Sequence, residues 1–371
     1  MSEAARPPVA GRRAGDAAAQ GDQRAYAALD LGTNNCRLLI AAPTTRGFRV
    51  LDAFSRIVRL GEGLARTGRL DDAAMERAMA ALRICADRIR RRGSPQVRAV
   101  ATQACRSAAN GKEFVARVEA ETGLRLHVIT PREEARLSVA GCVNLLDRES
   151  KAALVVDVGG GSTELSWVDL SELHVDPERR PPHPEKLPIK AWLSIPVGVV
   201  TLAERFPEDF DGRQAWFRAM VEAVRAEIEP FRRADELKPV FDADDAHLIG
   251  TSGAITSLAG LHLELDRYER SRVDGLWMTR LDCEAAAGRL MELTATQRAA
   301  QPCIGPDRAD LVLAGAAILQ AVQELWPCTR VRVADRGLRE GLLMSLMAKP
   351  PRRRRRGGRR GHQGGAVGAS Q

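Results

Sequence analysis

The sequence predicts an α/β protein made of two similarly built domains. Residues 26–42 contain a short apolar strand that ends in an aspartate, a glycine-containing turn and a second apolar strand, and the same arrangement returns at residues 153–168. A strand–turn–strand unit repeated at domain-sized spacing indicates an internal duplication. Segments with helical periodicity alternate with strand-like segments, which is typical of an α/β sheet.

The first half of the chain alternates regularly. After the opening hairpin, the pattern predicts a helix, a strand, a second helix and a second strand, at residues 71–92, 97–102, 110–122 and 124–129. We assign residues 25–136 to domain I.

Helices dominate the second half. Residues 176–188 contain five prolines, which predicts a surface loop. Four helices, a strand and a closing helix are predicted after it, at residues 215–234, 257–265, 282–293, 308–326, 331–334 and 337–347. We assign residues 137–334 to domain II and expect the helix within 335–348 to pack back on domain I.

The two ends differ from the rest of the chain. Residues 1–24 are rich in Ala, Gly, Arg and Pro, and we expect them to be disordered. Residues 349–371 hold eight basic residues and no acidic one, which leaves residues 1–348 without net charge although the total is +8. The predicted disordered tail is either an idle solubilising extension or a contact for a polyanion such as RNA.

Composition narrows the class of protein. A hydrophobic fraction of 44% and an aromatic fraction of 4% suit a globular protein with an aliphatic core. Apolar runs fall short of the ~18 residues of a membrane helix, and the N-terminus lacks the apolar core of a secretion signal, so we expect a cytoplasmic protein. Seven scattered cysteines without a C-x-x-C pair and six unclustered histidines argue against a disulfide framework and a thiolate zinc site.

The second hairpin carries the strongest chemical signal, Asp157-Val-Gly-Gly-Gly-Ser-Thr-Glu164. Three consecutive glycines at a strand end allow several backbone N–H groups to point into one concavity, where phosphate oxygens bind. Asp157 and Glu164 flank the turn and are candidates to hold Mg²⁺, directly or through water. The alternative is a plain glycine hairpin.

The first hairpin offers a matching turn, Asp30-Leu-Gly-Thr-Asn-Asn35. Thr33 and Asn34 can donate to phosphate, and Asp30 can help to place a metal ion or a water molecule. Alone this would be an ordinary turn. As half of a pair, it predicts two hairpins that clamp phosphate between the domains.

Two further segments are candidates. One is the segment after a predicted strand, which opens a helix and contains Gly250, Ser252 and Gly253. Either its N–H groups bind phosphate, or Thr251 or Ser252 is simply the N-cap of the helix. In Thr130-Pro-Arg-Glu-Glu134 a capping box accounts for Glu133. Glu134 lies at the expected hinge, where it is either a general base or a solvated charge.

Together these motifs resemble the exopolyphosphatase/guanosine pentaphosphatase (Ppx/GppA) family, whose members have the actin-like (ASKHA, ribonuclease H-like) duplicated two-domain fold with an interdomain cleft. The resemblance covers residues 25–346. It rests on six stretches in the same order, at residues 28–34, 101–110, 133–137, 156–165, 249–253 and 337–341.

The resemblance implies roles for individual residues. Glu134 would be the catalytic base, Asp157 and Glu164 would be the metal-associated carboxylates, and Arg106 would bind substrate phosphate. The phosphate cradle would consist of Gly159, Gly160, Gly161, Ser162 and Thr163, with Thr33 and Asn34 opposite. Asn35 replaces a serine common in the family, and the extra C-terminal helical region of longer members is absent, so the chain resembles a short two-domain form.

The expected function is a Mg²⁺-dependent hydrolase that removes the terminal phosphate of inorganic polyphosphate or guanosine pentaphosphate, which would link it to the stringent response. The resemblance also implies a homodimer. For the basic tail, polyphosphate becomes a second candidate polyanion beside RNA. Two alternatives of the same fold stay open: an ATP-dependent kinase of small molecules and a non-catalytic nucleotide-binding module. A base at the hinge favours the hydrolase over the binding module.

Overall fold

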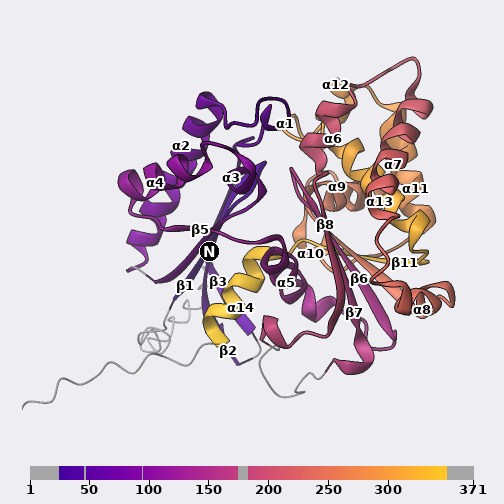
Figure 1. Cartoon of the computed structure of the whole chain (residues 1–371), viewed down its shortest axis with the longest axis horizontal. Helices are drawn as coiled ribbons and strands as arrows, with labels where there is room; N and C mark the ends of the chain where they lie inside the picture. Colours follow the sequence, from indigo (N-terminus) through magenta and orange to yellow (C-terminus); the bar gives the residue numbers. More distant parts are fainter. Residues whose placement is uncertain (1–24, 46, 94, 174–182, 349–371) are drawn as a thin grey trace, which may run out of the picture.

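The computed structural model describes residues 25–45, 47–93, 95–173 and 183–348. Two α/β domains lie side by side and are joined at the base by two helices (Figure 1). The predicted disordered ends, 1–24 and 349–371, and much of the predicted loop at 176–188 lie outside the described residues.

Domain I is built on a five-stranded sheet in the order β3-β2-β1-β4-β5. The first three strands are antiparallel neighbours, whereas β4 and β5 run parallel to β1. The strands are β1 Tyr26–Leu31, β2 Asn35–Thr44, β3 Gly47–Ile57, β4 Gln96–Ala101 and β5 Leu126–Val128. The helices are α1 Leu64–Thr67, α2 Asp72–Arg91, α3 Gln103–Ser107 and α4 Gly111–Thr122.

Domain II repeats this plan. Its six-stranded sheet has the order β10-β11-β9-β6-β7-β8, so β6, β7, β8, β9 and β11 take the places of β1 to β5, with β10 added at one edge. Directions match as well: β6, β7 and β8 are antiparallel neighbours, and β9 and β11 run parallel to β6. The predicted duplication and actin-like fold are confirmed. The strands are β6 Ala152–Val158, β7 Thr163–Asp169, β8 Ile189–Ile195, β9 Ala246–Thr251, β10 Trp277–Thr279 and β11 Arg330–Ala334.

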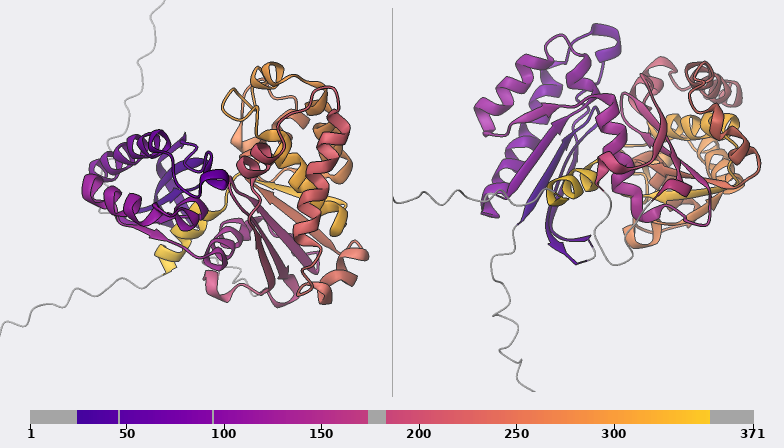
Figure 2. Two further views of the ribbon diagram at one scale, coloured as in Figure 1. Left: turned by 45° about the horizontal axis from the view of Figure 1, so that its top comes forward. Right: turned by 60° about the horizontal axis from the view of Figure 1, so that its bottom comes forward.

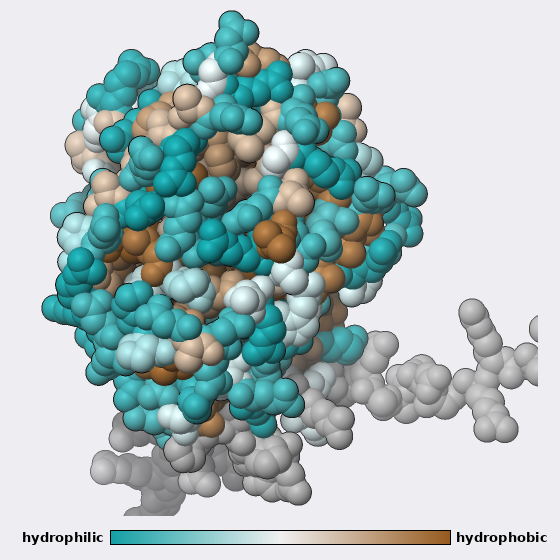
Figure 3. All heavy atoms as spheres, turned by 90° about the vertical axis from the view of Figure 1, so that its right-hand side faces the viewer, coloured by the Kyte–Doolittle hydropathy of each residue, from teal (hydrophilic) through white to brown (hydrophobic). Residues whose placement is uncertain are grey.

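Helices cover the domain II sheet, and the largest apolar core of the described residues lies between these helices and the sheet. The longer ones are α7 Arg213–Ile228, α9 Gly253–His262, α11 Arg280–Glu292 and α13 Val312–Leu325; the short ones are α6 Val199–Arg205, α8 Lys238–Asp242, α10 Arg270–Val273 and α12 Ala295–Ala299. On the face seen in Figure 3, hydrophobic side chains are scattered among hydrophilic ones, as is normal for a protein surface.

Two helices cross between the domains (Figures 1 and 2). They are α5 Pro131–Cys142, which leads from domain I into domain II, and α14 Leu338–Ala348, which packs against α5 and β1. A Cβ atom on Gly141 would overlap the carbonyl oxygen of Gly337, and one on Gly341 would overlap that of Leu137. The two backbones therefore approach to a distance that only glycine permits.

Several element boundaries differ from the predictions. The helix predicted for 215–234 spans Arg213–Ile228, and the one predicted from residue 308 begins at Val312. Strands β3, β8 and β10 were not predicted; β3 is half exposed, so it lacks a clear apolar face. Among the described residues, no helix is both long and apolar enough to cross a membrane.

Candidate active site

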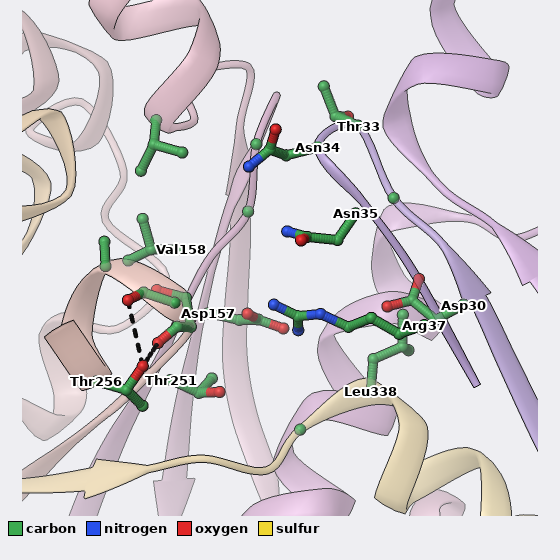
Figure 4. A pocket seen from close by; sticks show the side chains of 18 of the residues that line it. Asp30, Thr33, Asn34, Asn35, Arg37, Asp157, Val158, Thr251, Thr256 and Leu338 are labelled. Carbon is green, nitrogen blue, oxygen red and sulfur yellow. Dashed lines mark hydrogen bonds between the residues drawn. The ribbon is translucent and has the colours of Figure 1, made fainter. Parts of the chain in front are cut away.

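A cavity of about 170 Å³ lies between the domains. It is lined by the turns of both hairpins, the loop after β9, and the start of α14 (Figure 4). Twelve of the fifteen predicted site residues line it: Asp30, Thr33, Asn34, Glu134, Asp157, Gly159, Gly160, Gly161, Ser162, Glu164, Ser252 and Gly253. Segments far apart in sequence are therefore brought to one place by the duplicated fold.

Six carboxylates line the cavity: Asp30, Glu134, Glu164 and Glu340 are buried, and Asp157 and Asp335 are half-buried. Asp30 is the last residue but one of β1, Asp157 is the last but one of β6, and Glu164 lies opposite Asp157 on β7. Burial raises the pKa of Asp30 to about 6, and burial together with repulsion from Asp157 raises the pKa of Glu164 to about 7. Burial also raises the pKa of Asp157.

Glu134, in the first turn of α5, is only 8% exposed. Burial and repulsion from Glu164 raise its pKa well above the usual value, while Arg106 acts in the opposite direction. A carboxylate in this environment has a stronger tendency to take up a proton, which suits a general base.

Hydroxyl groups orient two of these carboxylates. Ser162 and Ser194 each donate to Oε1 of Glu164 at 2.8 Å. Ser138, one turn after Glu134 on α5, donates to Asp157. In contrast, Oδ1 of Asp30 is buried without a hydrogen-bond partner. An unpaired acceptor of this kind is costly unless a water molecule or an ion satisfies it.

Arg106 does not line the cavity. Its Nη1 donates to the carbonyl oxygen of Ile129 at 2.8 Å and to Oε2 of Glu134 at 3.2 Å. In this structure it therefore holds the predicted base. Glu133 also differs from the prediction: Thr130 accepts its N–H at 3.2 Å, but its carboxylate pairs with Arg98 in place of closing a capping box.

The two glycine turns touch across the cleft. A Cβ on Gly160 would lie 3.0 Å from the backbone nitrogen of Asn34, and one on Gly161 would press on Thr33 and Gln103. Thr33 also donates to Gln103 at 3.0 Å. Side chains at these glycines would force the turns apart, so the close approach of the two loops depends on them.

Two predicted phosphate-binding residues are absent from the cavity lining. Thr163 is fully buried, and its hydroxyl donates to the carbonyl oxygen of Val197 at 2.7 Å. Gly250 lies within β9 and faces Ile255. Both residues lie outside the cavity lining and contribute to the packing of the loops that form it.

The third loop, after β9, combines a helix start with strain. Ser252 caps α9 and has φ of 137°, a region that non-glycine residues rarely adopt. Thr256 donates to the carbonyl oxygens of Ser252 and Gly253, as the dashed lines in Figure 4 show. The hydroxyl of Ser252 accepts a hydrogen bond from the N–H of Ile255, so the interpretation of Ser252 as the N-cap is correct. Both Ser252 and Gly253 also line the cavity.

Four arginines that line the cavity were missed as site residues: Arg37, Arg308, Arg336 and Arg339. Arg37 lies opposite Asp30 in the β1–β2 register and reaches toward Asp157 (Figure 4). Its charge opposes the raised pKa values of both aspartates. Hairpin register would have revealed Arg37, and Arg339 lies in the stretch 337–341 that carries the family resemblance. Arg308 comes from a segment that only the tertiary structure brings close.

The predicted metal ligands do not form a ready-made cage. Among the described residues, no group of three or more His, Cys, Asp or Glu side chains is arranged to hold a metal ion. The surplus of buried carboxylates and the unpaired oxygen of Asp30 nevertheless suit a hard cation. Mg²⁺ usually keeps several waters and binds one or two carboxylates together with substrate phosphates, which is compatible with this donor set.

Glycine turns that meet across a carboxylate- and arginine-lined cleft, in a duplicated actin-like fold, identify a protein that handles phosphoryl groups. The Ppx/GppA phosphatase family matches residues 39–350, so the chain belongs to that family and is a phosphatase.

Solved structures agree with this assignment. An exopolyphosphatase-like protein is 30% identical with a TM-score of 0.73, covering 87% of this chain and 98% of that one. The Ppx/GppA family member from Aquifex aeolicus is 28% identical with a TM-score of 0.67, covering 87% and 97%. An exopolyphosphatase from Cytophaga hutchinsonii shares the fold at 24% identity, with a TM-score of 0.71 over 87% and 97% of the chains.

Proposed function

We propose that this chain is a Mg²⁺-dependent phosphoanhydride hydrolase that removes the terminal phosphate of inorganic polyphosphate, guanosine pentaphosphate or both. The observation that carries the proposal is the buried Glu134, which faces a cleft bounded by two glycine turns. Similarity to an exopolyphosphatase-like protein supports the same substrate class.

Water would attack the terminal phosphorus and transfer its proton to Glu134. The bond from phosphorus to the bridging oxygen breaks, and orthophosphate leaves together with the shortened chain. Arg106 holds one oxygen of Glu134 at 3.2 Å, and the other oxygen would accept the proton of the water. Because burial raises the pKa of Glu134, its carboxylate is a better proton acceptor than an exposed glutamate.

The substrate oxygens would be held by backbone N–H groups of the two glycine turns, with Arg37 and Arg308 at the walls. Guanidinium groups suit this task because their planar donors match phosphate oxygens. Asp157, Glu164 and Asp30 would hold Mg²⁺, which would supply positive charge against the phosphate oxygens. These guanidinium groups would favour anionic phosphate chains over neutral esters.

A panel of phosphate-release assays tests the proposal. We expect release from polyphosphate or guanosine pentaphosphate with Mg²⁺, a much lower rate with EDTA, and little release from ATP. ATP-dependent phosphorylation of a small-molecule acceptor without net phosphate release would instead assign the chain to the kinases of this fold. Absence of release from every phosphoanhydride would reject the hydrolase.

A further inference from the structure

A loop of domain I reaches across to domain II at residues 58–63, just after β3. Arg59 makes a bidentate ion pair with Asp310, with Nη1 to Oδ2 at 2.9 Å and Nη2 to Oδ1 at 3.0 Å. Its Nη2 also donates to the carbonyl oxygen of Asp307 at 3.2 Å. Nearby, the N–H of Gly63 donates to Oε1 of Glu204 on α6 at 2.9 Å. These contacts join the two domains away from the hinge helices.

On each side of the Arg59–Asp310 contact, the chain is connected to residues that line the cavity. The backbone N–H of Arg59 donates to the carbonyl oxygen of Asn34, a residue of the first phosphate turn, at 3.1 Å. On the other side, Asp307 and Asp310 flank Arg308, whose guanidinium lies beside Gly253 in the cavity wall. Arg59 therefore connects the phosphate turn of domain I to the segment of domain II that carries Arg308.

The loop presents Arg59 in a fixed geometry. Arg77 of α2 donates to the carbonyl oxygens of Val58 and Arg59 at 3.0 and 3.4 Å, and to Glu62 at 2.8 Å. Arg59 itself has φ of 47°, the left-handed region that arginine rarely occupies. Such an outlier persists only where surrounding contacts enforce it, and it often marks a functional position.

We propose that Arg59 is a positioning residue: its ion pair with Asp310 forms when the cleft is closed and holds Arg308 toward the substrate phosphates. The proposal rests on the proposed function in taking Arg308 as a phosphate-binding group. Arg59 and Asp310 are both partly exposed, with side-chain exposures of 32% and 50%. An exposed pair adds little to folding stability, but the same small free energy can shift the balance between open and closed domains.

A double-mutant cycle of Arg59→Gln and Asp310→Asn tests the contact. Each single variant should raise KM for polyphosphate about five-fold, the change that ~1 kcal/mol represents, and the double variant should be no worse than either single. Arg83→Gln is the matched control, because it removes an exposed ion pair with Glu121 inside domain I; its KM should not change. Multiplicative effects of the two single variants would overturn the contact.

A second cycle asks whether Arg59 acts through Arg308. In the Arg308→Gln background, Arg59→Gln should cause little further rise in KM. Independent rises of similar size in both backgrounds would overturn this route. Equal thermal midpoints of all variants would exclude a folding defect as the cause.

Small-angle scattering tests closure without relying on hydrolysis. The Arg59→Gln protein should have a larger radius of gyration than the parent and Arg83→Gln proteins, and tripolyphosphate should reduce the difference. If the Arg59→Gln and parent proteins had identical radii both with and without tripolyphosphate, the proposed role of the Arg59–Asp310 ion pair in closure would be overturned. If the radii differ as expected but the parent protein releases no phosphate, the proposed hydrolysis would be rejected, whereas the role of the Arg59–Asp310 ion pair in closure would stand.

Discussion

At the scale of single residues, neighbouring glutamates on one helix turn have opposite environments. Glu134 points into the cavity and is buried, whereas Glu133 is partly exposed and pairs with Arg98. The difference follows from the direction of α5, which Thr130 and Pro131 start at the hinge. A one-residue step on a helix turns the side chain by roughly 100°, so the fold buries one carboxylate and leaves its neighbour near solvent.

The contact between Arg106 and Glu134 predicts a change in pH dependence. Glu134 must be deprotonated to act as a base, so activity falls as pH drops through its raised pKa. Arg106 favours the charged form, so Arg106→Gln should move the acid limb of kcat/KM to higher pH, while Arg106→Lys should move it less. An unmoved acid limb with a raised KM would instead assign Arg106 to substrate binding.

Asp157 gives a prediction about the metal. Replacement by Asn removes an anionic oxygen and keeps the size of the side chain, so the Mg²⁺ concentration for half-maximal rate should rise. Magnesium titrations at saturating substrate measure it, with Asp169→Asn at the far end of β7 as a control. An unaltered magnesium requirement would place Asp157 outside any metal site.

At the scale of elements, the hinge depends on glycines in two crossing helices. Gly141→Ala would press a methyl group against the backbone of Gly337, so the free energy of unfolding should fall by about 1–3 kcal/mol. Gly288→Ala on α11 is the matched control, because nothing lies within 4 Å of the added atom, and it should stabilise by up to about 1 kcal/mol. Urea unfolding measures both; equal effects would contradict tight packing at the hinge.

Sequence patterns predicted the elements that have a clear signature. The two hairpins were found because apolar runs flank glycine turns, and α2 because its helical periodicity extends from the N-cap Asp71. Strand β10 pairs at a sheet edge and has only three residues, so local pattern could not mark it. The glycines at 141 and 341 have no local signature, since their role exists only where two distant helices meet.

At the scale of the whole molecule, duplication explains most of the site. Each domain contributes a strand with an aspartate just before its last residue and a turn that faces its counterpart, so Asp30 and Asp157 occupy equivalent positions in the two sheets. The paired motifs could therefore be recognised from sequence. Arg308 could not, because no motif marks its segment and only the tertiary structure brings it to the cavity.

The central claim is that Glu134 activates water for attack on a phosphoanhydride. The most direct test is the turnover of Glu134→Gln beside Glu133→Gln, measured as phosphate release from polyphosphate and guanosine pentaphosphate. Glu134→Gln keeps size and removes the base, so kcat should fall by ~10²–10⁴ with KM nearly unchanged. Glu133→Gln loses only a partly exposed ion pair and should retain most of its activity. A Glu134→Gln protein that turns over at close to the parent rate would contradict the account.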